Sequence, residues 1–413
     1  MKGSVSMSVS PLSVAVCRTY QAGFKLVMGT NFFNWKEPYL LEGPGSIRKL
    51  PALIKSKGIN SVLIVTDKGL TGLHLLDSLY EELDNSNIKY KVFDDVQPNP
   101  SIENIEAAKE SYLGGGCEAI IAFGGGSPMD CAKAAGARVA NPKISVRKMR
   151  GLLKIRKPLP PLFAVPTTAG TGSEVTLAAV VTDEETHEKC PINDPKLRPG
   201  YAVLDPELTV GLPPKVTSTT GMDALTHAVE AYIGRSNVAN TEDYARKAVK
   251  LIFDNIQVAY NDGKNIEARG NMLKASYYAG MAFTRAYVGY VHAIGHNLGG
   301  FYHIPHGLAM AVILPYVLDY YGESAYERLS QLADIAGLET SGLSQAQKAQ
   351  LFIAKVREYN SAMGIPEHIE GILEKDVPTI AQRALKEGNP LYPVPKLMGF
   401  DECMYLIRKI GNI

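Results

Sequence analysis

The sequence predicts an α/β domain over residues 29–212 and an all-helical domain over residues 213–413. Two observations carry this prediction. Short β-rich runs alternate with helical patterns as far as about residue 212, and such alternation is typical of a largely parallel sheet covered by helices. Beyond that point the strands stop and amphipathic helical patterns follow one another.

The α/β prediction depends on β-rich runs that end in Asp, Gly or Pro. They are SVLIVTD (61–67), YKVFDDV (90–96), AIIAFGG (119–125), PLFAVPTT (161–168), LAAVVTD (177–183) and YAVLDP (201–206). The helical prediction depends on segments such as YARKAVKLIFDNIQVAYN and AQKAQLFIAKVREYNSAMG, whose apolar residues recur at helical spacing. Pro213 and Pro214 mark the boundary between the two patterns.

Composition argues against several classes of function. The net charge is +1 and no long run of Lys or Arg is present, so neither nucleic acid nor a membrane surface is expected as a partner. No apolar run reaches the roughly 18 residues that a membrane span needs. The five cysteines are odd in number and form no CxxC pair, which favours a reducing cytoplasm.

Residues 1–28 are predicted to be a disordered N-terminal extension. Lys2 followed by apolar residues loosely resembles a signal peptide, but Ser and Pro interrupt the apolar region. An over-long start, with Met28 as the initiator, is the other interpretation.

The segment AIIAFGGGSPMDCAKAAGARVA is typical of a buried strand, a tight turn and a helix. Gly125 and Gly126 allow close approach by a ligand, and the N–H groups at the start of a helix form an anion site. Ser127 is predicted to cap the helix, with Asp130 completing an approximate capping box. A phosphate is the expected occupant, and a well-capped turn without a ligand is the alternative.

Two further loops support a nucleotide ligand. Thr167, Thr168 and Thr171 follow a buried strand, and loops at the carboxyl ends of strands are where α/β sheets bind ligands. Asp67 ends the first clear strand, where a carboxylate can hold a ribose 2′-hydroxyl and repel a 2′-phosphate, which favours NAD over NADP. A plain polar loop and an Asx turn are the respective alternatives.

Polar residues recur at helical spacing in two apolar segments. Asp223 and His227 are four residues apart, as are His292 and His296, so each pair lies on one helix face. One such pair could be a satisfied core contact, because buried polar groups find partners. Two pairs, with His306 in a third segment, indicate a site for Fe(II), Zn(II) or a similar ion.

Taken together, these motifs resemble those of the iron-containing (group III) alcohol dehydrogenases. GGGSPMD, PTTAGTGSEVT, DPELTVGLPP, GMDALTHAVEAY and HAIGHNLGGFYHIPHG occur in the order and at the spacing typical of that family, over roughly residues 35–410. The resemblance implies a dinucleotide-binding α/β domain followed by a helical metal- and substrate-binding domain, an architecture similar to that of dehydroquinate synthase.

The resemblance also implies roles for individual residues. The implied metal ligands are Asp223, His227, His292 and His306, with His303 excluded. The implied cofactor contacts are Asp67, Gly125, Gly126, Ser127, Asp130, Thr167, Thr168, Thr171 and Lys189. His296 matches a histidine beside the metal and nicotinamide that helps to move a proton, and Phe283 matches an aromatic residue near the nicotinamide.

Two features depart from the family pattern and put the substrate in doubt. Arg285 and Tyr287 stand where many members have Asn and Gly, and both are expected to narrow the pocket or make it more polar. The usual ALKD and NPR elements near the C-terminus are altered to ALKEGNPLYPVPKLM.

The implied activity is hydride transfer between NAD(H) and a small primary alcohol or diol, or the matching aldehyde. Fe(II) is the expected metal, with Zn(II) and Mn(II) as alternatives that the same ligands suit. A glycerol dehydrogenase-like polyol oxidoreductase and a non-catalytic nucleotide-binding protein are the competing hypotheses. The expected partners are a small-molecule substrate and further copies of the chain, in a homodimer or higher homo-oligomer.

Overall fold

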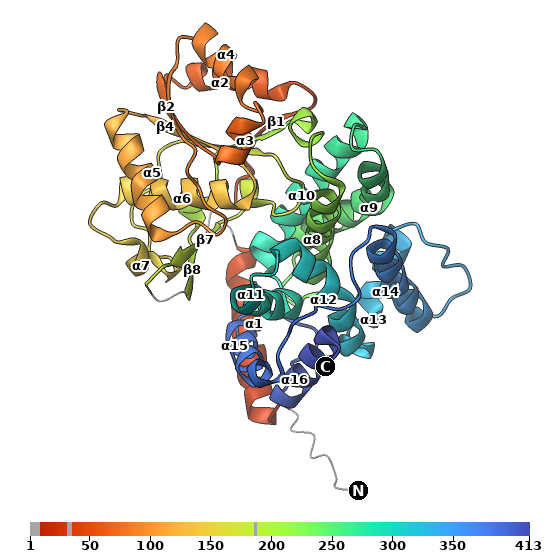
Figure 1. Cartoon of the computed structure of the whole chain (residues 1–413). Helices are drawn as coiled ribbons and strands as arrows, with labels where there is room; N and C mark the ends of the chain where they lie inside the picture. The colour runs from red at the N-terminus through yellow and green to blue at the C-terminus, as the bar shows by residue number, and fades with distance from the viewer. Residues whose placement is uncertain (1–8, 31–34, 186–187) are drawn as a thin grey trace, which may run out of the picture. The chain divides into compact units, whose positions relative to one another are not determined.

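The computed structural model describes residues 9–30, 35–185 and 188–413, which belong to two compact units (Figure 1). The sheet unit comprises Trp35–Leu212 and Gly263–Gly280. The helical unit comprises Met1–Asn34, Pro213–Asp262 and Met281–Ile413. The predicted fold class, an α/β part followed by a helical part, is confirmed.

A six-stranded parallel sheet forms the centre of the sheet unit. Its strands lie in the order β1 (Tyr39–Glu42), β9 (Tyr201–Leu204), β6 (Leu162–Pro166), β4 (Ala119–Gly124), β2 (Ser61–Val65) and β3 (Lys89–Phe93). A smaller sheet contains β5 (Gly151–Leu152), β8 (Glu188–Asn193) and β7 (Ala178–Asp183), of which β7 and β8 pair antiparallel.

Helices cover both faces of the six-stranded sheet (Figure 1). Because successive side chains of a strand point to opposite faces, β2 contributes Leu63 and Val65 to one core and Val62 and Ile64 to the other. The first core is completed by α5 (Ile102–Gly114) and α6 (Gly126–Ala140), the second by α2 (Leu50–Ser56) and α4 (Asp77–Asn85). The short helices α3 (Lys68–Gly72) and α7 (Val146–Met149) lie in connections.

The strand order reverses between β2 and β4. The chain runs from β2 outward to the edge strand β3, returns to β4 on the other side of β2, and then continues to β6 and β9. In open α/β sheets a ligand binds outside the carboxyl ends of the strands at such a reversal. The turns that follow β2 and β4 are therefore the expected ligand-binding turns of this unit.

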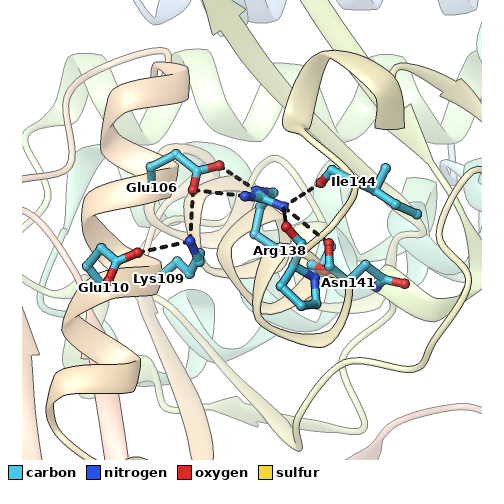
Figure 2. A network of polar contacts seen from close by, with 8 residues as sticks. Glu106, Lys109, Glu110, Arg138, Asn141 and Ile144 are labelled. Atoms are coloured by element: carbon cyan, nitrogen blue, oxygen red, sulfur yellow. Dashed lines mark hydrogen bonds and ion pairs between the residues drawn. The ribbon is translucent and has the colours of Figure 1, made fainter.

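An ion-pair network fixes the C-terminal end of α6 (Figure 2). The Arg138 guanidinium pairs with Glu106 of α5 and donates hydrogen bonds to the backbone carbonyls of Asn141 and Ile144. Lys109 also pairs with Glu106. Arg138 lies in the last turn of α6, where a cation interacts favourably with the helix dipole, and its bonds attach the segment that follows the helix. The network therefore stabilises the position of α6.

The helical unit is built from α-helices. They are α1 (Pro11–Gly29), α8 (Pro214–Ile233), α9 (Ala239–Asn261), the end of α10 (Ile266–Ala286), α11 (Tyr290–Tyr302), α12 (His306–Tyr321), α13 (Glu323–Ile335), α14 (Gln345–Ala362), α15 (Val377–Gly388) and α16 (Phe400–Gly411). Among the residues that the structure describes, none of these helices has both the length and the apolar character needed to cross a membrane.

The sequence-based domain boundary differs from the structure at α10. Residues 263–280 group with the sheet unit, although they follow the predicted boundary at residue 213. The reason is a close backbone approach, since a Cβ at Gly280 would lie 2.8 Å from the carbonyl oxygen of Gly172. The N–H of Gly172 also donates to Ser276 Oγ at 3.2 Å.

The predicted disorder of residues 1–28 is wrong where the structure describes them. Helix α1 begins at Pro11, the first-turn position that proline suits, and the Ser10 side chain accepts a hydrogen bond from the Ser13 N–H as its N-cap. Cys17 and Gln21 are buried on one face. Residues 1–8 of this prediction lie outside the described residues.

Candidate metal centre and nucleotide loop

The four predicted metal ligands lie together within the helical unit. Asp223 and His227 are one turn apart on α8, His292 is on α11, and His306 is the first residue of α12. One ligand atom from each residue lies within 4.8 Å of the others, and His306 alone of the four is exposed. His303, which was excluded from the set, is exposed at the end of α11 with a left-handed φ of 55°.

Buried polar atoms in this cluster fit a divalent cation. Within the described residues, Asp223 Oδ1 and His292 Nε2 are buried and have no hydrogen-bond partner, a state that is costly unless a ligand relieves it. Burial raises the pKa of Asp223 to about 8 and lowers the pKa of His292 well below its usual value. A cation would replace the proton on Asp223 and accept the lone pair of His292.

Glu230 orients His292 and was missed by the sequence analysis. Its Oε2 lies 2.6 Å from His292 Nδ1, and its two oxygens accept the backbone N–H groups of Gly289 and Val291 at 2.8 Å. A carboxylate that accepts from Nδ1 leaves Nε2 available for a metal. A signal was present, because Glu230 lies three residues after His227 and hence on the same face of α8.

The two residues predicted to take part in catalysis lie beside the candidate ligands. The Phe283 ring stacks on His227, with centroids 4.1 Å apart and planes at 14°. The His296 ring stacks on His306, with centroids 5.3 Å apart and planes at 17°. His296 Nδ1 also lies 2.7 Å from Glu387 Oε1.

In the sheet unit, the glycine turn after β4 lies against the threonine turn after β6. A Cβ at Gly125 would lie 3.3 Å from Thr168 Oγ1, and one at Gly126 would lie 3.2 Å from Thr171 Cγ2. Thr167 is buried and its N–H donates to the carbonyl of Gly124 at 3.1 Å. Larger side chains would fill the space over the start of α6, so the glycines keep its N–H groups accessible.

The predicted cap at Ser127 is wrong. Helix α6 begins at Gly126 with Gly125 as its N-cap, and Ser127 Oγ instead accepts from the Asn99 N–H at 3.3 Å. Asp130 completes no capping box, because its carboxylate accepts from the N–H of Val180 in β7 at 3.1 Å. Desolvation raises the pKa of Asp130 to about 6.

Lys133 is a buried residue that the sequence analysis missed. Its Nζ donates to Ser173 Oγ, Thr176 Oγ1 and the Ala178 carbonyl, each at 2.9 Å. Burial lowers its pKa to about 8. Lys133 therefore fixes the segment that follows the threonine turn.

Asp67 and Lys189, the other two predicted cofactor contacts, both have partners within the sheet unit. Asp67 follows β2 and caps α3, accepting from the Leu70 N–H at 3.1 Å, which is the Asx-type arrangement named above as the alternative. Lys189 in β8 donates to Asn99 Oδ1 at 3.2 Å. Asn99 thus connects Lys189 to Ser127 of the glycine turn.

Comparison with known proteins identifies the class. A family model described as iron-containing alcohol dehydrogenase matches residues 38–206, and one described as the C-terminal part of the Fe-containing alcohol dehydrogenase family matches residues 217–410. The chain belongs to the iron-containing alcohol dehydrogenase family. The predicted family and enzyme class, an NAD-dependent alcohol dehydrogenase, are confirmed.

Individual relatives cover nearly the whole chain. The 1,3-propanediol dehydrogenase of Citrobacter freundii is 40% identical over 368 residues, which are 88% of this chain and 92% of the relative. The lactaldehyde reductase of Escherichia coli (strain K12) is 36% identical over 355 residues, 84% of this chain and 92% of the relative. A crystal structure of a 1,3-propanediol oxidoreductase has a TM-score of 0.88 at 37% identity, covering 91% of this chain and 99% of that one.

Proposed function

We propose that the chain interconverts small primary alcohols or diols with their aldehydes, by hydride transfer to or from NAD(H), at the cluster of Asp223, His227, His292 and His306. The observation that carries the proposal is that these four residues each offer a ligand atom, all within 4.8 Å of one another. Two atoms of the same residues, Asp223 Oδ1 and His292 Nε2, are buried without a hydrogen-bond partner among the described residues. Such a set of one carboxylate and three imidazoles suits a divalent transition metal.

Each part of the helical-unit site has a proposed task. A bound divalent ion would supply Lewis-acid polarisation of the substrate oxygen. Phe283, whose ring lies flat on His227, would offer an apolar face to the nicotinamide. His296, held at Nδ1 by Glu387, would pass a proton to or from the substrate oxygen through its other nitrogen.

The sheet unit would hold the cofactor through its turns, and the helical unit would hold the metal ion. The glycine and threonine turns, with Lys189, would hold the pyrophosphate, since α6 presents N–H groups there. Asp67 would favour NAD over NADP through its charge. Fe(II) is proposed as the ion, and Zn(II) and Mn(II) remain to be tested on the same ligands.

The proposed substrates are aldehydes of one to three carbons, including hydroxylated ones. Support comes from relatives whose names are 1,3-propanediol dehydrogenase, lactaldehyde reductase and NAD-dependent methanol dehydrogenase. The test is NADH oxidation with propanal, 3-hydroxypropanal, lactaldehyde and formaldehyde, using protein purified without oxygen and loaded with Fe(II). Turnover that is lost on chelation and restored by Fe(II) is expected.

Two controls sharpen this experiment. His292→Ala is expected to lose both metal and turnover, whereas His303→Ala, which changes an exposed histidine near the same cluster, is expected to keep both. Reduction of NAD with glycerol alone would favour a polyol oxidoreductase. Metal-loaded protein that turns over no aldehyde with NADH or NADPH would contradict the proposal.

The cellular setting and the assembly are also proposals. We infer a reducing cytoplasm, because the five cysteines are buried and form no disulfide among the described residues. A homodimer or higher homo-oligomer is proposed from the resemblance to the family, and light scattering of the purified protein would measure it.

A further inference from the structure

Helix α1 lies within the helical unit beside the loop that joins α15 to α16 (Figure 1). It precedes residue 38, where the family match begins. The loop, Asn389–Gly399, is called the proline loop here because it contains Pro390, Pro393 and Pro395. It forms no helix or strand, yet residues 392–395 are buried. Its carbonyl groups therefore need hydrogen-bond donors from elsewhere.

Helix α1 supplies several of these donors, beside the N–H groups of Val394 and Arg235, which donate to the carbonyls of Tyr392 and Pro393. Gln21 Nε2 and the Arg18 guanidinium donate to four carbonyl oxygens at 2.7–3.3 Å. The acceptors are the carbonyls of Pro390, Tyr392, Val394 and Pro395. A hydrogen bond from a charged donor such as Arg18 is stronger than one from a neutral amide. The conformation of the proline loop therefore depends on α1.

An aromatic contact joins α1 to the same loop. The Phe24 ring meets Tyr287 edge-on, with centroids 4.7 Å apart, and Tyr287 in turn lies 6.1 Å from Tyr392. Tyr287 has a φ of +64°, a conformation that a bulky residue adopts only when its surroundings stabilise it. Tyr287 was expected to narrow the substrate pocket, but its described ring contacts are with Phe24 and Tyr392.

Hydrogen bonds continue from the proline loop to His296. The Tyr392 hydroxyl donates to Glu387 Oε1 at 2.9 Å, and the same oxygen lies 2.7 Å from His296 Nδ1. Asn297 Nδ2 approaches the other carboxylate oxygen at 3.4 Å. Tyr392 is buried, so it cannot exchange this bond for one to bulk water without moving the loop.

We propose that α1 is a positioning element for His296, acting through the proline loop, Tyr392 and Glu387. Arg18 and Gln21 hold the loop, Tyr392 then holds the Glu387 carboxylate, and Glu387 fixes the plane and tautomer of the His296 ring beside His306. The inference rests on the proposed function, in which His296 moves a proton at the substrate oxygen. Loss of the α1 contacts would let the Glu387 carboxylate and the ring turn.

The kinetic test compares Arg18→Ala and Tyr392→Phe with wild type. Because general acid–base catalysis contributes about 10²–10⁴ in rate, a misdirected His296 is expected to lower kcat several-fold while KM for the aldehyde and metal content stay unchanged. Lys25→Ala is the matched control, since Lys25 is an exposed cation on the same helix. Arg18→Lys is expected to recover part of the loss.

The same substitution made in a His296→Ala background distinguishes an effect through His296 from a general effect on stability. If α1 acts through His296, Arg18→Ala lowers kcat little further once His296 is absent. If α1 only stabilises the fold, Arg18→Ala lowers kcat by the same factor in both backgrounds and also lowers thermal stability. That result overturns the inference.

A second readout is independent of turnover. In zinc-loaded protein with ¹⁵N-labelled histidine, the His296 ring nitrogens, assigned with His296→Ala, are expected to shift in Arg18→Ala and Tyr392→Phe but not in Lys25→Ala. Unchanged His296 signals in both variants would overturn the inference even if wild type is active. Absence of activity with these shifts present would refute the proposed function alone.

Discussion

Replacement of Glu230 by Gln tests whether the buried carboxylate prepares His292 for a metal. One Glu230 oxygen accepts from Gly289 N–H and, in the Nδ1–H tautomer that leaves Nε2 for a metal, also from His292 Nδ1; the other accepts from Val291 N–H. The carboxamide of Gln has one acceptor oxygen. Its NH₂ group must therefore face at least one of these three donors.

The magnitude follows from the least costly orientation. With the NH₂ group toward Val291, one buried N–H loses its acceptor, which costs about 1–3 kcal/mol. The remaining oxygen can still accept from His292, but without the negative charge that makes the imidazole a better ligand. Loss of such an outer partner lowers metal affinity about 10–100-fold, or ~1.4–2.8 kcal/mol.

The assay is competition with a chelator of known Zn(II) affinity, together with thermal unfolding of the metal-free protein. Glu242→Gln is the matched control, because Glu242 is a half-buried glutamate of the helical unit that pairs with Arg328. Zinc affinity within a factor of three of wild type, at unchanged metal-free stability, would refute the reasoning about Glu230.

Three other substitutions test the sheet unit. Burial raises the pKa of Glu174 from 4.5 to about 7, so the folded chain retains a proton that the unfolded chain releases, and stability falls as pH rises through that window. In chelator-treated protein, the thermal unfolding midpoint of Glu174→Gln should therefore be higher than that of wild type at pH 8 and equal to it at pH 4.5. Equal midpoints at pH 8 would contradict this. Asp67→Asn keeps an N-cap side chain but removes the charge, so kcat/KM for NADPH in steady-state kinetics should rise about ten-fold. An unchanged ratio of kcat/KM for NADPH to that for NADH would exclude a role of Asp67 in cofactor preference. Gly124→Ala should weaken NADH binding in a fluorescence titration and lower stability by ~1–3 kcal/mol, because the new Cβ would lie 2.6 Å from Pro128 Cγ at a φ of +144°; wild-type stability would refute it.

The central strands could be predicted because their signal is local. Strands β2, β4 and β6 are buried on both faces, and such strands have nearly continuous apolar sequences. Two strands of the smaller sheet were missed for the opposite reason. β5 has two residues, and β8 has the sequence EKCPIN, whose strand conformation is stabilised by its pairing with β7.

The error at Ser127 shows where local signals compete with distant ones. Ser127, Pro128 and Asp130 together have the residue types of a helix N-terminus. The partner that decides the conformation of Asp130 is the N–H of Val180, 50 positions later. A side chain that is engaged by a neighbouring strand cannot cap its own helix, and no local pattern indicates that engagement.

In the candidate metal site, too, contacts within one helix could be predicted and contacts between distant segments could not. The pairing of Asp223 with His227 could be predicted, because residues four apart share a helix face, and the structure brings the pair to His292 and His306. The contact between His296 and Glu387 spans 91 positions and has no spacing that indicates it. The ligand roles themselves stay predictions until a metal is measured.

Helix α1 was the largest error, and its cause is physical. Sequence patterns indicate where apolar faces or complementary charges meet, but Arg18 and Gln21 bind backbone carbonyls, and every residue has one. What distinguishes the acceptors is that they lie in a proline-rich, buried loop without regular hydrogen bonding. The altered segment ALKEGNPLYPVPKLM was therefore informative, since a buried loop of this kind requires donors from another segment, and Arg18 and Gln21 provide them from the part of the chain that was predicted to be disordered.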